Sequence, residues 1–398
     1  MERMTEDAIN RLSCHKGDPI KMSALDELTE LTAGLENQAI KDWKAQGKKV
    51  VGFFCTYVPE EILYAADILP YRVAAPGCTQ TTSADVYMTH VNCSFVRSCL
   101  EYALEGKYDF LDGLVFTNSC DDIRRMSDIL RTIDPKRLPL IGFLDVPKKV
   151  DEYSIAWYRD EMSAFRGNVE KAFGVKVTDA KLKKAIEVYN ETRDLLKQLY
   201  ELRRADNPPI TGTETMKVLL AATTTPREEF NRLMKKLLKE IKGREGVSNY
   251  KARLMISGGG GCDDPAYFDV MEELGGLVVT DTDCFGSRYF WKPVQIIEDD
   301  LMLGLAKSYL DRPSCARMMD RIDERIDFIK EMVRNFKVDG VIFQTLINCQ
   351  VWGGQLLAIR EEMKKAGIPF MELDREYALS GTGQLKTRVQ AFLERIEK

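Results

Sequence analysis

Residues 92–122 read N-C-S-F-V-R-S-C-L-E-Y-A-L-E-G-K-Y-D-F-L-D-G-L-V-F-T-N-S-C-D-D. The apolar run at residues 111–117 is typical of a buried strand in a parallel sheet. Cys120 follows this run closely, and the helical pattern of residues 123–130 comes next. Because open α/β sheets bind ligands at the carboxyl ends of their strands, this order predicts a functional role for Cys120.

The same order of elements returns near the end of the chain. Residues 338–344 have the pattern of a strand, Cys349 follows it, and residues 356–365 have the pattern of a helix. Cys93 precedes its own helix, although N-C-S-F-V-R-S could equally be an ordinary helix start. Cys55 follows another predicted strand and is a fourth candidate. We expect these cysteines to contribute to one shared cluster.

Composition restricts the classes of protein that this chain can represent. Its 398 residues suffice for two or three domains, and 44% hydrophobic with 30% charged residues is ordinary for a globular protein. The net charge of -5 gives no basic footprint for nucleic acid. The charged residues 1–7 do not resemble a signal peptide, and no apolar run reaches membrane-spanning length. We therefore expect a cytoplasmic protein.

The chain is rich in cysteine and poor in histidine. It has 10 cysteines, and its 2 histidines argue against a His-ligated zinc or non-haem iron enzyme. A reducing cytosol disfavours disulfides, so the cysteines point to metal or redox chemistry. No C-x-x-C pair occurs, which excludes zinc ribbons and ferredoxin-type runs. Any iron–sulfur site must therefore be assembled from cysteines far apart in the sequence.

Apolar runs alternate with helical patterns in two parts of the chain. Strands are predicted at residues 48–54, 69–73, 111–117, 140–143, 253–257, 276–281, 338–344 and 369–373. Strands that alternate with helices form parallel sheets, so we expect an α/β fold with two doubly wound domains around a cleft.

The rest of the chain is expected to be helical, which gives four segments. They are an N-terminal helical segment (1–48), a first α/β domain (49–150), a helical connector without strands (151–250) and a second α/β domain (251–398). In the N-terminal segment, Leu28, Leu31, Leu35 and Ile40 are spaced for one apolar helix face.

Two loops are further candidates for a binding site. Residues 258–261 are G-G-G-G after a strand, but they lack the spacing and the Lys-Ser/Thr of a phosphate loop. A tight turn is therefore slightly favoured over close approach to a ligand. Residues 286–291, G-S-R-Y-F-W, either line a pocket or form an interface. In the pocket interpretation Arg288 and Tyr289 bind substrate.

Other residues have an ordinary structural interpretation beside the functional one. Glu61 lies in the first turn of a helix that starts at Pro59, where it either handles protons or stabilises the helix dipole. Cys14, Cys99 and Cys315 fall inside helical patterns, and we interpret them as small buried apolar residues.

Several segments together carry a resemblance to a known family. They read C-T-Y-V-P-E-E (55–61), N-C-S-F-V-R-S-C (92–99), Y-D-F-L-D-G-L-V-F-T-N-S-C-D (108–121), D-D-P (263–265), C-F-G-S-R-Y-F-W (284–291) and R-E-Y-A-L-S-G-T-G-Q-L-K-T-R-V-Q-A-F-L-E (375–394). In this order the chain resembles the 2-hydroxyacyl-CoA dehydratase / benzoyl-CoA reductase family. The last segment, with S-G-T-G-Q-L, resembles benzoyl-CoA reductase subunits more closely than dehydratase subunits.

The resemblance implies a cofactor and partners. Members pair two related subunits into a heterodimer, and each subunit has two Rossmann-like domains around a 4Fe-4S cluster. By motif position the cluster ligands correspond to Cys93, Cys120 and Cys349, while Cys55 matches a position close to the cofactor whose ligation stays open. The resemblance also allows a double-cubane cluster shared across a dimer. A separate ATP-hydrolysing iron–sulfur activator delivers electrons one at a time.

Three functions agree with this resemblance. The first is a benzoyl-CoA reductase-type subunit that reduces an aromatic acyl-CoA with low-potential electrons. The second is a 2-hydroxyacyl-CoA dehydratase subunit that eliminates water through a ketyl radical. The third is a non-catalytic subunit that relays electrons or holds its partner. The first reaction consumes electrons stoichiometrically, whereas the second uses them catalytically.

Overall fold

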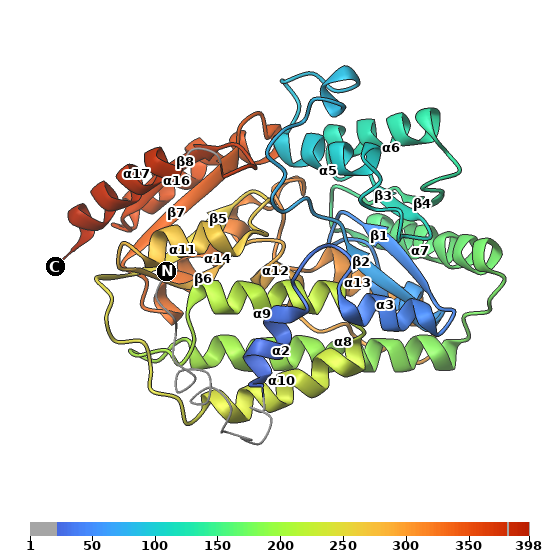
Figure 1. Cartoon of the computed structure of the whole chain (residues 1–398), viewed down its shortest axis with the longest axis horizontal. Helices are drawn as coiled ribbons and strands as arrows, with labels where there is room; N and C mark the ends of the chain where they lie inside the picture. Colours follow the sequence, from blue (N-terminus) through green and yellow to red (C-terminus); the bar gives the residue numbers. More distant parts are fainter. Residues whose placement is uncertain (1–21, 380–381, 398) are drawn as a thin grey trace, which may run out of the picture.

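The computed structural model describes residues 22–379 and 382–397 and contains two parallel sheets. The first has the strand order β2-β1-β3-β4 and the second the order β6-β5-β7-β8 (Figure 1). Every neighbouring pair is parallel. Both sheets therefore follow one plan, and the predicted α/β class with two doubly wound, Rossmann-like units is confirmed.

The first sheet is built from four short strands and the helices that connect them. Its strands are β1 (Lys49–Phe53), β2 (Ile68–Arg72), β3 (Leu114–Thr117) and β4 (Leu140–Leu144). Its helices are α4 (Glu60–Ala65), the 3-10 turn η1 (Ala84–Val86), α5 (Ser94–Leu104) and α6 (Asp121–Ile133). Strand β3 is shorter than predicted. Before it begins, the Asp112 amide donates to the Val50 carbonyl, and the Asp112 carboxylate accepts from the Val50 amide.

The second sheet has longer strands and more helices. Its strands are β5 (Ala252–Gly258), β6 (Gly276–Asp281), β7 (Gly340–Leu346) and β8 (Phe370–Arg375). The helices are α11 (Pro265–Glu272), α12 (Ser287–Phe290), α13 (Leu301–Leu310), α14 (Ile322–Asn335), α15 (Gln350–Gly353), α16 (Leu356–Lys365) and α17 (Thr382–Ile396). Strands β5 to β7 are buried along their whole length, as expected for strands covered on both faces.

Four long helices link the two sheets along the chain, and the second and third of them extend from one sheet to the other (Figure 1). They are α7 (Glu152–Phe173), α8 (Asp179–Leu202), α9 (Gly212–Thr224) and α10 (Arg227–Ile241). Helix α9 contacts β2 of the first sheet and β6 of the second, and α8 packs on α4 and α12. No described helix has the length and the apolar character needed to cross a membrane.

One part of the second half packs with the first. Apolar side chains between residues 294 and 318 join the core that contains β1 and α7, and α13 lies against α7. The two halves are therefore joined by packing as well as by the connecting helices. The boundaries given above for the four segments stay a prediction.

The expected apolar helix face near the N-terminus is divided between two helices. These are α2 (Ala24–Glu30) and α3 (Gln38–Ala45), with Leu31 and Leu35 outside both. The chain turns at Gly34, whose φ of 77° is left-handed, and Asn37 caps α3 by accepting from the Ile40 amide. Cys14 and the other residues of 1–21 lie outside the described residues.

The end of β5 requires glycine. Gly258 has a φ of 112°, and an added Cβ would lie 2.1 Å from the carbonyl oxygen of Gln344. We predict that Gly258→Ala lowers the free energy of unfolding by about 1 to 3 kcal/mol, measured by urea denaturation. Gly243→Ala is the control, because no atom lies within 4 Å of its added Cβ. Equal stability of the two variants would contradict the prediction.

Candidate functional site

A cavity of about 140 Å³ lies between the two halves of the chain and is lined by six cysteines. They are Cys55, Cys93 and Cys120 from the first half and Cys284, Cys315 and Cys349 from the second. None of the cysteines in the described part of the chain forms a disulfide. Loops after β1, β3, β6 and β7 supply four of these thiols, so the site lies where parallel sheets place ligands.

The three predicted ligands share a local geometry. Cys93, Cys120 and Cys349 are the N-cap residues of α5, α6 and α15. The backbone N–H groups of a first helical turn carry partial positive charge, which favours a thiolate over a thiol. The structure brings these three cysteines to one cavity, and their binding of iron stays a prediction.

Burial keeps these thiols protonated when no cation is present. It raises the pKa of Cys93 to about 12, with the Cys349 thiol acting in the same direction. It also raises the pKa of Cys120 well above the ordinary value, while the backbone N–H of Ile123 opposes the rise. A coordinating metal deprotonates a thiol outright, so a cationic cofactor would convert these groups into ligands.

One part of the cavity wall is rich in arginine. Arg72, Arg288 and Arg317 line it together with Cys284 and Cys315. Burial raises the pKa of Cys284 to about 12. Burial also acts to raise the pKa of Cys315, but Arg288 and Arg317 outweigh it and hold this pKa below its ordinary value.

The interpretation of Cys315 as a residue buried within a helix is wrong. Cys315 lies in the loop between α13 and α14, shortly after Pro313, and its side chain lines the cavity. Cys99 behaves as predicted, because it is fully buried on α5 in the core beside the first sheet.

Sequence reasoning also missed Cys284 and Arg72. Cys284 follows β6 just as Cys120 follows β3, so the strand-end rule could have found it. Arg72 ends β2 and gives no such signal. Gly260 and Gly261 line the cavity, so the glycine-rich loop after β5 is a tight turn and also part of the cavity wall.

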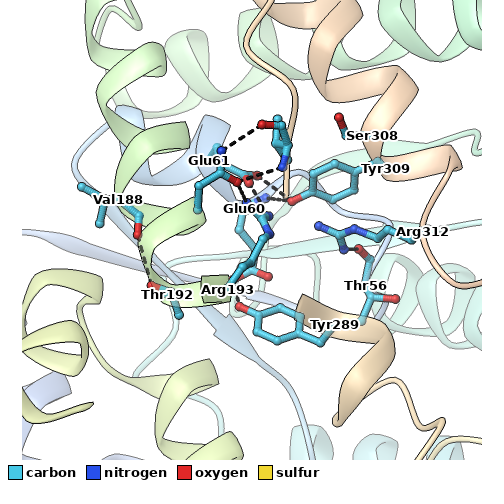
Figure 2. Close-up of polar contacts among 12 residues, drawn as sticks. Thr56, Glu60, Glu61, Val188, Thr192, Arg193, Tyr289, Ser308, Tyr309 and Arg312 are labelled. Atoms are coloured by element: carbon cyan, nitrogen blue, oxygen red, sulfur yellow. Dashed lines mark hydrogen bonds and ion pairs between the residues drawn. The ribbon is translucent and has the colours of Figure 1, made fainter. Parts of the chain in front are cut away.

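The other predicted site residues divide between two places. Arg288 lines the cavity, whereas Glu61 and Tyr289 lie outside its lining, in a buried network (Figure 2). Glu61 pairs with Arg193 at 2.5 Å and accepts a 2.5 Å hydrogen bond from Tyr309. The Tyr289 hydroxyl lies 3.2 Å from a carboxylate oxygen of Glu60.

Glu61 is held as a carboxylate by this network. Burial acts to raise its pKa, but Arg193, Arg312 and Tyr309 outweigh burial and leave the pKa below the ordinary value. Both oxygens of Glu61 have partners on helices that lie far away in the sequence. This arrangement suits a residue that joins the two halves, and a proton-handling role for Glu61 stays a prediction.

The donor set of the cavity suits an iron–sulfur cluster. In the described parts of the chain, no three His, Cys, Asp or Glu side chains converge on a single metal ion. A cluster attaches its thiolate ligands to different irons, which spreads them over a wider site. The lining residues include six thiols but no histidine or carboxylate, and soft thiolates select iron–sulfur clusters over hard cations.

Comparison with known families agrees with this donor set. The model of the family described as "2-hydroxyglutaryl-CoA dehydratase, D-component" matches residues 55–396. The chain belongs to this family. The match covers all six cavity cysteines, β2 to β4 of the first sheet, the whole second sheet and the connecting helices, and it begins just after β1.

Individual members of the family catalyse different reactions. The chain is 28% identical to a subunit of the benzoyl-CoA reductase of Thauera aromatica, over 78% of this chain and 81% of the relative. It is 26% identical to the (R)-phenyllactyl-CoA dehydratase beta subunit of Clostridium sporogenes, over 93% of this chain and 97% of the relative. It is 23% identical to the beta subunit of (R)-2-hydroxyglutaryl-CoA dehydratase of Acidaminococcus fermentans, over 94% of this chain and 99% of the relative. The family is therefore enzymatic, and these names do not decide between reduction and dehydration.

The buried pair of Glu61 and Arg193 generates a stability prediction. Glu61→Gln leaves Arg193 buried without its counter-charge, so we expect the free energy of unfolding to fall by about 3 to 5 kcal/mol in urea denaturation. Lys183→Ala breaks an exposed pair with Glu298 and should change it by less than about 1 kcal/mol.

The same pair also predicts a pH dependence. Because the folded pKa of Glu61 is depressed, its contribution is present above the unfolded pKa and is lost as pH falls through the folded pKa. The difference in stability between wild type and Glu61→Gln should therefore shrink in acid. A difference that does not change with pH would contradict the assigned ion pair.

Proposed function

We propose that this chain is the iron–sulfur subunit of a benzoyl-CoA reductase-type enzyme, which reduces an aromatic acyl-CoA thioester with low-potential electrons. The observation that carries the proposal is the single cavity lined by six cysteines, three from each half. Four of its thiols lie in loops at the carboxyl ends of strands, where this fold binds ligands. Membership of an enzymatic acyl-CoA family supplies the substrate class.

The ligands we propose are Cys93, Cys120 and Cys349, with the remaining cavity thiols extending the site. Six thiols in one chain exceed what a single 4Fe-4S cluster needs, which favours a double-cubane cluster held within one subunit over one shared across a dimer. When bound, such a cofactor supplies electrons at low potential.

The number of thiols favours reduction over dehydration. Reduction of an aromatic ring consumes electrons in pairs, whereas dehydration through a ketyl radical borrows a single electron and returns it. A site with six thiolates can hold more iron than one with three, and so can store more than one electron. The 2-hydroxyacyl-CoA dehydratase is the second candidate, and a subunit that only relays electrons is the third.

The residues around the thiols serve to exclude water. Phe54, Phe95 and Trp352 line the cavity and present apolar surface to it. Removing water from a low-potential site prevents loss of electrons to side reactions. We further propose a related second subunit that completes the substrate site as a heterodimer, and an ATP-hydrolysing iron–sulfur activator that supplies the electrons. The names of several relatives identify them as subunits.

Iron content tests the assigned ligands. We predict that Cys120→Ala, Cys349→Ala and Cys284→Ala each lose iron and inorganic sulfide and weaken the charge-transfer absorbance near about 400 nm. Cys99→Ala is the control, because Cys99 is buried in the core outside the cavity lining. Full iron loading of Cys120→Ala and Cys349→Ala would place the cluster elsewhere, and an iron-free active wild type would refute the proposal.

Electron accounting tests the reaction. With the partner subunit, activator, ATP and reductant, we expect an aromatic acyl-CoA to be reduced with two electrons consumed for each product molecule. A 2-hydroxyacyl-CoA offered in the same assay should remain unchanged. Turnover of the hydroxyacyl-CoA with only catalytic amounts of reductant would instead identify the dehydratase.

A further inference from the structure

Arg72 presents unpartnered hydrogen-bond donors inside the cavity. The residue is 4% exposed, and its Nη2 lies 3.4 Å from the Cys284 sulfur. Its Nε and Nη1 are buried without a hydrogen-bond partner. The guanidinium lies 4.4 Å from the centre of the Phe285 ring, which fixes its position at the cavity wall. A buried guanidinium with two free nitrogen atoms is suited to an anionic ligand.

Arg288 repeats this arrangement on the same wall. It is 5% exposed, lies 4.8 Å from the centre of the Trp352 ring, and its Nε has no partner. Neither Arg72 nor Arg288 forms an ion pair within the described residues. Burial acts to lower the pKa of Arg288, but Cys315, Cys284 and then Asp283 outweigh it and raise that pKa, so the thiols of the cavity are the nearest groups that act on this guanidinium.

Some of the other buried arginines are paired with carboxylates. Arg193 and Arg227 lie outside the cavity lining and bind Glu61 and Glu60 at 2.5 and 2.6 Å. Burial of a cation without a counter-charge is unfavourable, and a protein offsets it with an anion or a full set of hydrogen bonds. At the cavity wall the described residues provide neither for Arg72, so the compensating charge must come from what the cavity holds.

We propose that Arg72 and Arg288 compensate the negative charge of a thiolate-ligated iron–sulfur cofactor at the wall formed by Cys284 and Cys315, and thereby raise its reduction potential. This inference rests on the proposed function. The two arginines then place positive charge beside Cys284 and Cys315, and the charge around the cofactor is unevenly distributed.

The asymmetry follows from the charges beside the two groups of thiols. Cys93, Cys120 and Cys349 lie at helix N-termini, and the carboxylate that acts on all three is that of Asp122, which accepts from the Cys93 amide at 3.3 Å. One-electron reduction adds one negative charge and forms or breaks no bond at these residues. A positive charge beside the cofactor stabilises that added charge, so the arginine wall favours the reduced state.

The experiment measures the midpoint potential of the iron-loaded protein in a redox titration followed by EPR. We expect Arg72→Gln and Arg288→Gln to shift the potential to more negative values at unchanged iron and sulfide content. Arg203→Gln is the matched control, because Arg203 is equally buried and has an unpartnered Nε but lies outside the cavity lining. Its potential should equal that of the wild type.

A second variant separates charge from packing. Arg72→Lys keeps the positive charge, so its potential should stay at the wild-type value, and it decides the question if Arg72→Gln does not fold. A more negative potential in Arg72→Lys, or unchanged potentials in both Gln variants, would overturn the inference. Wild-type protein without iron would instead refute the proposed function, so the two failures are distinguishable.

Discussion

Buried charge that must be neutralised locally is the constraint on which this molecule depends. Two parallel sheets of the same plan direct loops from their strands' carboxyl ends toward one cavity, where three guanidiniums are buried and six thiols are buried or half-buried. Thiols tolerate this environment as neutral groups, but thiolates and guanidiniums need opposite charges nearby. A cluster of iron and sulfide held by thiolates meets both needs, since its irons neutralise thiolates and its overall negative charge suits arginine.

Close to Cys55 in the sequence, buried charges are neutralised by side chains of the protein itself. Glu60 and Glu61 begin α4, and each is paired with an arginine from a connecting helix. Glu61 pairs with Arg193 (Figure 2), and Glu60 pairs with Arg227. Tyr309, on a helix of the second half, completes the set. The network thus joins three parts of the chain close to the first cavity loop.

The sequence predicted what depends on local pattern and missed what depends on tertiary packing. Apolar runs between helices located every described strand, and the strand-end rule placed Cys120 and Cys349 at the cavity. Cys315 was missed because no strand precedes it, and it reaches the cavity only because α13 packs on α7 of the first half. Arg72 was missed because its role depends on Cys284, which approaches it from the other sheet.

Because the cavity is shared by both halves, binding of the proposed cofactor would be linked to the joining of the halves. Cys55 and Cys349 lie in loops of different sheets and face one cavity only when the sheets are in place. Metal binding to such a site contributes its free energy to the folded arrangement, because no preformed site exists in the separated halves. Arg72 and Cys284, which bond across the same boundary, then connect the charge state of the cavity to the contact between the two sheets.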